Sequence, residues 1–271
     1  MNDVLEGVLA DLTAQSAELE QRVADLSDDQ WREPTPAPGW DIATQIAHLA
    51  WTDEAATAAA LSVGGDKEPW DELVLAAMSD PNHVVDKAAL AGGQVPAVEL
   101  LARWREARTA LAEALRDVPH GEKMPWFGPP MSPTSMATAR FMETWAHSLD
   151  VYDALVAAGL LEGVPEPTDR IRHVAHIGVR TRNFSFMARD LPTPSEEFRV
   201  VLAAPSGETW CYGPEEAAQT VTGSAYDFCL LVTQRINRAD TDLVCLGADA
   251  DAWLDIAQCF AGNPGEGRAA R

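Results

Sequence analysis

The chain has 271 residues and a formal net charge of −22 at pH 7, from 42 acidic and 20 basic side chains. A polyanion would be repelled over most of such a surface, so the charge argues against nucleic acid as a partner. Hydrophobic residues make up 46% of the sequence without forming an apolar run that could cross a bilayer, and the first residues carry acids where a signal peptide carries basic residues. We therefore expect a globular, cytoplasmic protein that contacts neither nucleic acid nor a membrane.

The first elements in chain order are helices. Residues 2–26 place apolar side chains at helical spacing, with acids between them. Asp41 is a suitable N-cap for a second helix, which an alanine-rich run extends to about Leu61. The stretch 62–95 is rich in glycine, proline and asparagine, so we expect loops there, interrupted by a short helix over 70–78.

Two further long helices complete the first part of the chain. One begins near Pro96 and extends to Val118, and the next begins after a cap at Ser132 or Ser135 and extends to about Ala158. Four long amphipathic helices joined in this way are typical of an antiparallel bundle.

The composition changes after residue 160, where β-rich runs appear. The expected elements are a helix over 170–190, a hairpin over 197–213, a strand followed by a helix over 217–236, a strand over 241–247 and a helix over 249–260. This part of the chain is therefore expected to be α+β.

All cysteines lie in this second part, at positions 211, 229, 245 and 259. No pair has the C-x-x-C spacing of a zinc ribbon or a redox motif. In a cytoplasmic protein such cysteines are expected to be buried free thiols.

The helix over 132–158 carries ionisable side chains among apolar ones. Glu143, His147 and Asp150 follow i, i+4, i+7 spacing and share one stripe of the helix. A carboxylate buried beside an imidazole is costly unless its charge is compensated, and a divalent cation does this while using both groups as ligands. His48 is the best third ligand, because it is the only other histidine in the expected bundle helices.

Two histidines and one carboxylate with open positions are typical of a catalytic metal site. Asp150, or the neighbouring pair Asp53 and Glu54, could then contact the ligands from outside. The alternative is structural: Glu143 and His147 form an ordinary helix pair, and His48 is a core histidine.

Three stretches together resemble the mycothiol-dependent maleylpyruvate isomerase superfamily: "GWDIATQIAHLAWTDEAA", "ARFMETWAHSLDVYDAL" and "TVTGSAYDFCLLVTQR". The resemblance implies a DinB-like four-helix bundle over 1–160 that binds a divalent metal, commonly zinc, through His48, Glu143 and His147. It also implies a smaller α+β domain over 161–271, similar to sterol-carrier-like folds.

In that family an arginine at the end of the helix after "VTG" is important for activity. This role maps onto Arg235, with Arg238 as the alternative. The segments "PWFGPPMSPTSMATAR" and "GVRTRNFSFMARDLP" differ from the characterised isomerases and indicate a distinct subfamily, so maleylpyruvate itself is not inherited as the substrate.

The resemblance favours an isomerase or S-transferase that uses a divalent metal and mycothiol on a small electrophilic substrate, with carboxylated molecules among the candidates. A second hypothesis is a hydrolase or cyclase that uses the metal without a thiol, and a third is a non-catalytic carrier of a metal or an apolar ligand. Nickel, iron and manganese suit the same ligands as zinc. The oligomeric state stays open, with a homodimer among the alternatives.

Overall fold

The computed structural model describes residues 3–262, 264–265 and 267–271. The chain divides into two compact units, with the boundary between Pro165 and Glu166. The class is α+β, as predicted: a helical first unit is followed by a second unit with a small sheet.

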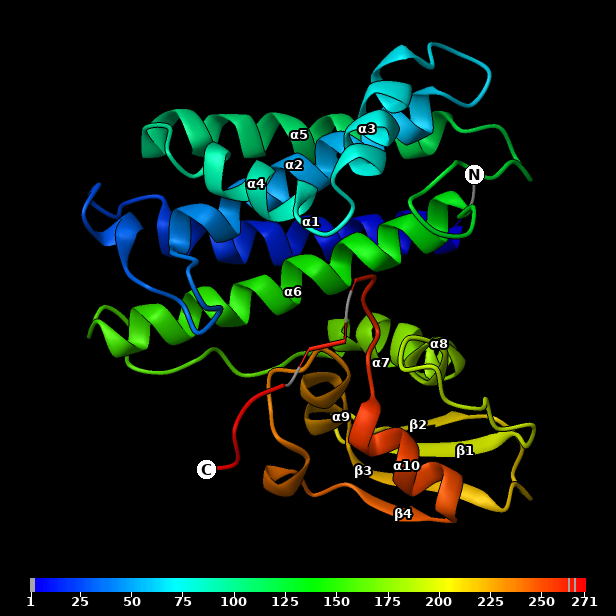
Figure 1. Ribbon diagram of the computed structural model, residues 1–271. Helices are drawn as coiled ribbons and strands as arrows, with labels where there is room; N and C mark the ends of the chain where they lie inside the picture. The colour runs from blue at the N-terminus through cyan, green and yellow to red at the C-terminus, as the bar shows by residue number, and fades with distance from the viewer. Residues whose placement is uncertain (1–2, 263, 266) are drawn as a thin grey trace. The chain divides into compact units, whose positions relative to one another are not determined.

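Four long helices lie side by side in the first unit (Figure 1) and confirm the predicted bundle. They are α1 (Asp3–Val23), α2 (Ile42–Leu61), α5 (Ala97–Asp117) and α6 (Pro133–Ala157). A short 3-10 helix, Gln30–Arg32, lies between α1 and α2. Almost every side of α2 is buried, because α5, α6 and the shorter helix α4 (Val84–Gly92) all pack against it.

Local hydrogen bonds cap the N-termini of α2 and α6. The Asp41 carboxylate accepts from the Thr44 amide at 2.8 Å, and the Ser132 hydroxyl accepts from the Ser135 amide at 3.1 Å. Both predicted N-caps are therefore present, and each satisfies an amide that the first helical turn leaves without a partner.

The stretch predicted to be mainly loops contains two helices. The short helix α3 (Glu68–Ser79) was expected, but α4 (Val84–Gly92) was not. A Cβ added to Gly92 would lie 3.1 Å from the Ala47 Cβ of α2, so the helix ends against the bundle with little space between. Packing against α2 thus stabilises a helix that local propensity alone does not predict.

The second unit is built on a four-stranded sheet in the order β2-β1-β3-β4. Its strands are β1 (Phe198–Ala203), β2 (Thr209–Tyr212), β3 (Gln219–Ser224) and β4 (Val244–Leu246). The central pair β1 and β3 is parallel, and both outer strands are antiparallel to their neighbours. The predicted hairpin is β1 and β2.

Helices lie on one side of this sheet in Figure 1. They are α7 (Arg172–Arg180), α8 (Arg182–Met187), α9 (Ala225–Val232) and α10 (Ala248–Ile256), with 3-10 turns at Asp169–Ile171 and Arg238–Asp240. Phe228 and Phe198 each meet the ring of Trp253 edge-on, with centroids 5.7 Å apart. These aromatic contacts join α9, α10 and β1 into one core.

The single helix predicted over 170–190 is wrong, because the structure breaks it between α7 and α8. The Thr181 hydroxyl donates to the carbonyl of Ile177 at 2.8 Å and lies 3.2 Å from that of Gly178. The Thr181 backbone leaves the helical region, with φ −94° and ψ 8°, and α7 ends there.

The four cysteines are free thiols, but they are not all buried. Cys229 and Cys259 are buried and Cys245 is partly exposed, whereas Cys211 is exposed. Cys211 departs from the prediction because it points outward from β2, an edge strand of the sheet.

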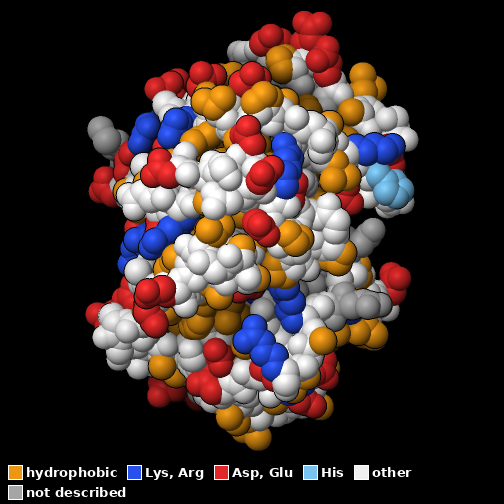
Figure 2. All heavy atoms as spheres, turned by 90° about the vertical axis from the view of Figure 1, so that its left-hand side faces the viewer, with side chains coloured by type: hydrophobic (Ala, Val, Ile, Leu, Met, Phe, Trp, Pro, Cys, Tyr) orange, Lys and Arg blue, Asp and Glu red, His pale blue; other side chains and the backbone are white. Residues whose placement is uncertain are grey.

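Acidic side chains are spread over the face drawn in Figure 2, with small groups of Lys and Arg between them. Among the described residues, no helix combines the length and the apolarity needed to cross a membrane.

Candidate metal centre

The site lies between α2 and α6. His48 is in the first half of α2, and Glu143 and His147 lie one turn apart in the middle of α6. Apolar neighbours bury most of α6 along this stretch, including Phe141, which is fully buried. The bundle core therefore fixes both helices around three polar side chains.

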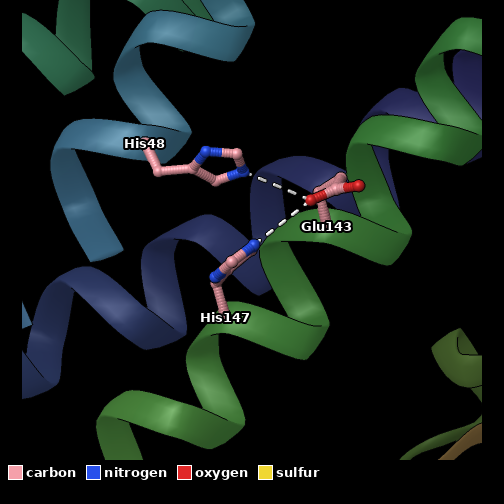
Figure 3. A group of neighbouring side chains, drawn as sticks. All are labelled: His48, Glu143 and His147. Carbon is pink, nitrogen blue, oxygen red and sulfur yellow. Dashed lines mark hydrogen bonds and ion pairs between the residues drawn. The ribbon is translucent and has the colours of Figure 1, made fainter. Parts of the chain in front are cut away.

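The three side chains predicted as ligands point toward one another (Figure 3). The Nε2 atom of His48 lies 3.4 Å from Glu143 Oε2, and the Nε2 atom of His147 lies 3.2 Å from the same oxygen. Each residue offers one possible ligand atom, a ring nitrogen or a carboxylate oxygen, and these three atoms all lie within 4.8 Å of one another. Two imidazole nitrogens thus meet a single carboxylate oxygen.

The electrostatics of the cluster suit a cation. Burial raises the pKa of Glu143, but hydrogen bonds and positive charge from His147 and His48 outweigh this and hold it well below 4.5. When the Nε2 atoms of both imidazoles carry no hydrogen, lone pairs on two nitrogens and one oxygen face each other, which is favourable only around a positive charge. The donor set of two nitrogens and one carboxylate oxygen therefore fits a divalent metal ion.

The cluster stays accessible from one side. The side chains of His48, Glu143 and His147 are 9%, 22% and 13% exposed. The partly exposed ring of Trp40 stacks on His147 with an interplanar angle of 16° and centroids 6.0 Å apart, and it also lies 5.4 Å from His48. The three side chains are therefore not sealed from solvent.

The acidic side chains predicted to contact the ligands are not among the three residues whose ligand atoms converge. Asp53 pairs with Arg140, and Glu54 accepts two hydrogen bonds from Arg103 at 2.6 and 2.7 Å. Asp150 is buried on α6 and is not part of the cluster, since it lies almost a full turn beyond His147.

Sequence reasoning missed Gln45. Its Oε1 atom lies 2.5 Å from Nδ1 of His147, the ring nitrogen that faces away from Glu143. The available signal was its position three residues before His48, which places an uncharged polar side chain on the same face of an otherwise apolar helix.

Arg235 lies in the second unit, just after α9. The amides of Gln234 and Arg235 donate to the carbonyls of Leu231 and Leu230, and Gln234 has a φ of 60°. This pattern is a Schellman motif, which ends the helix and turns the chain at the arginine. Arg238 forms ion pairs with Asp251 and Asp255.

Comparisons with known proteins agree with this architecture. Residues 12–152 match the family described as "Mycothiol maleylpyruvate isomerase N-terminal domain", and residues 194–246 match one described as "Wyosine base formation". The chain is 52% identical over 261 residues to uncharacterized proteins from two strains of Mycobacterium tuberculosis, covering 96% of this chain and 97% of each relative.

Two solved structures share the fold. The crystal structure of mycothiol-dependent maleylpyruvate isomerase has a TM-score of 0.57 at 13% identity, and that of a mutant of this enzyme has 0.59 at 14%. Each comparison covers 89% of this chain and 92% of the other.

Proposed function

Because the chain belongs to the mycothiol-dependent maleylpyruvate isomerase superfamily, we propose that it is a metal- and thiol-dependent isomerase or S-transferase. The substrate we propose is a small electrophilic molecule. The convergence of His48 and His147 on one oxygen of Glu143 is the observation that carries this proposal.

In the proposal, His48, Glu143 and His147 hold the metal, with zinc as the first choice and nickel, iron or manganese as alternatives. A metal bound there would lower the pKa of a thiol and so supply a thiolate at neutral pH. Glu143 contributes negative charge to the site, and the two imidazoles contribute neutral nitrogen donors. The indole of Trp40 covers the imidazoles on one side and limits their contact with water.

The thiol must come from outside the helical unit, since the sequence has no cysteine before residue 211. The family to which the chain belongs favours a low-molecular-weight thiol such as mycothiol. We further propose that Arg235 binds a carboxylate of the substrate with its planar guanidinium group. Arg238, which forms ion pairs with Asp251 and Asp255, is the alternative.

The test is zinc binding by wild type, His147→Ala and His83→Ala. His83 is an exposed histidine that pairs with Asp80 and lies outside the cluster, so it is the matched control. We expect one zinc ion per chain in wild type and in His83→Ala, and strongly reduced binding in His147→Ala.

Thiol use is tested on the cobalt-substituted protein. We expect mycothiol to produce an intense thiolate-to-metal absorption band in wild type. If wild type binds no metal, the proposed function is wrong and a carrier role is favoured. If it binds metal but the band is absent, the site acts without a thiol, as in a hydrolase or cyclase.

A further inference from the structure

Gln45 contacts the proposed metal site from behind. Its side chain is fully buried on α2, and its Oε1 atom lies 2.5 Å from Nδ1 of His147 on α6. The contact is on the side of the imidazole opposite to Glu143, whose oxygen faces Nε2. The ring of His147 is therefore held between an amide and a carboxylate.

The hydrogen bonds around Gln45 determine which way its amide points. The Thr35 hydroxyl has one hydrogen, which it donates to the carbonyl of Trp40 at 2.9 Å. The same hydroxyl must then accept from the Nε2 group of Gln45, which lies 2.8 Å away. The Oε1 atom is thereby left to face His147, and because it is an acceptor, Nδ1 of His147 must carry the hydrogen.

Backbone hydrogen bonds stabilise the turn that contains Thr35. The Thr35 amide also donates to the Trp40 carbonyl at 2.9 Å, and the Trp40 amide donates to Ala37 at 3.0 Å. Gly39 has a φ of +79°, which allows the chain to close this turn. One short segment thus fixes the Gln45 amide and places the indole of Trp40 over the imidazoles.

We propose that Gln45 is a positioning residue that holds His147 in the tautomer with hydrogen on Nδ1, so that Nε2 presents its lone pair toward Glu143. This inference rests on the proposed metal site, for which a neutral Nε2 donor is required. Groups that orient metal-binding histidines in this way typically change metal affinity by about 10- to 100-fold when they are removed.

The first experiment reads the tautomer directly. Long-range ¹⁵N–¹H spectra of the metal-free protein, recorded at alkaline pH where imidazoles are neutral, distinguish hydrogen on Nδ1 from hydrogen on Nε2. We expect the Nδ1–H pattern for His147 in wild type and in Gln45→Glu, whose carboxylate also accepts. In Gln45→Met the acceptor is lost, so a mixture of tautomers is expected.

The second experiment is zinc affinity by competition with a chelator. We expect Gln45→Met to lose about 10- to 100-fold and Gln45→Glu to stay close to wild type. If Gln45→Met does not fold, Thr35→Val replaces it, because that change removes the group that anchors the amide. Thr57→Val is its control: the Thr57 hydroxyl bonds only along α2, to Asp53 at 2.9 Å, among the contacts described.

An Nε2–H pattern in wild type would overturn the inference, as would unchanged tautomer and affinity in both Gln45→Met and Thr35→Val. If wild type shows the Nδ1–H pattern but binds no zinc, the metal site is refuted while the tautomer assignment stands. The two failures are therefore distinguishable.

Discussion

Breaking the ion pair between Arg140 and Asp53 should destabilise the bundle strongly. The Nε atom of Arg140 on α6 donates to Asp53 Oδ1 on α2 at 2.8 Å, and Nη2 donates to the Thr52 hydroxyl at 2.5 Å. The two charged side chains are only 3% and 4% exposed. Replacing Arg140 by methionine keeps much of the volume but leaves the Asp53 carboxylate buried without its partner.

The magnitude follows from the geometry. At 2.8 Å and an effective dielectric of about 20, the attraction is about 6 kcal/mol before desolvation is subtracted. Losing one partner of such a pair typically costs about 3–5 kcal/mol, while replacing both by apolar residues is close to neutral. We therefore expect a loss of about 3–5 kcal/mol for Arg140→Met, but about 1 kcal/mol or less for the double variant Arg140→Met, Asp53→Leu.

The assay is urea unfolding of wild type, both single variants and the double variant, followed by circular dichroism. Burial raises the pKa of Asp53, and the charge and hydrogen bond of Arg140 lower it, so removing Arg140 raises the pKa of this carboxyl further. Protonation in the folded state then offsets the loss, and the deficit of Arg140→Met should shrink as the pH falls toward 3.8, the ordinary pKa of the group. A cost below about 1 kcal/mol at neutral pH, or additive single effects, would refute the reasoning.

Three further predictions test other contacts. Burial raises the pKa of Glu20, but hydrogen bonds from two α5 arginines hold it below 4.5. Glu20→Gln should therefore lower Tm above pH 4.5. The difference in Tm from wild type should vanish as the pH falls through the pKa of Glu20 in the folded protein. A thiol reagent should label the exposed Cys211 within the folded protein but Cys229 only on unfolding, since burial raises the pKa of Cys229 far above 9.0. Gly207→Ala should cost about 1 kcal/mol in chemical unfolding from positive φ alone, whereas Gly213→Ala should cost clearly more, because its Cβ would lie 2.0 Å from the Phe198 carbonyl oxygen.

The bundle could be predicted because its signals are local. Apolar spacing and the caps at Asp41 and Ser132 act within a few residues, so the four long helices follow from the sequence. The helix α4 and the break at Thr181 could not be predicted in the same way. The first depends on the space that α2 leaves at Gly92, and the second on a change of backbone conformation at Thr181 that no apolar spacing marks.

The candidate site, like the fold, could be predicted from the sequence only in part. Glu143 and His147 follow from spacing on one helix, and His48 follows because few other histidines are available. Asp53 was placed near the ligands, since an acid close to His48 suits that role, but its buried partner Arg140 comes from another helix and is 87 residues away. Gln45 carries no charge and is 102 residues from His147, so nothing in the local sequence connects the two.

The contacts between α2 and α6 pair residues that run in opposite directions along the two helices, and this pairing cannot be read from either helix alone. Along α2, the side chains of Gln45, His48 and Asp53 meet those of His147, Glu143 and Arg140, which follow one another along α6 in reverse order. The three residues proposed to bind metal thus lie between two polar contacts, an amide-to-imidazole bond on one side and a buried ion pair on the other. The buried ion pair joins the two helices next to the site, whereas the bond from Gln45 acts on the ring of His147. Stability loss at the ion pair and affinity loss at Gln45 should therefore be separable, since the first contact fixes the helices and the second fixes one ring.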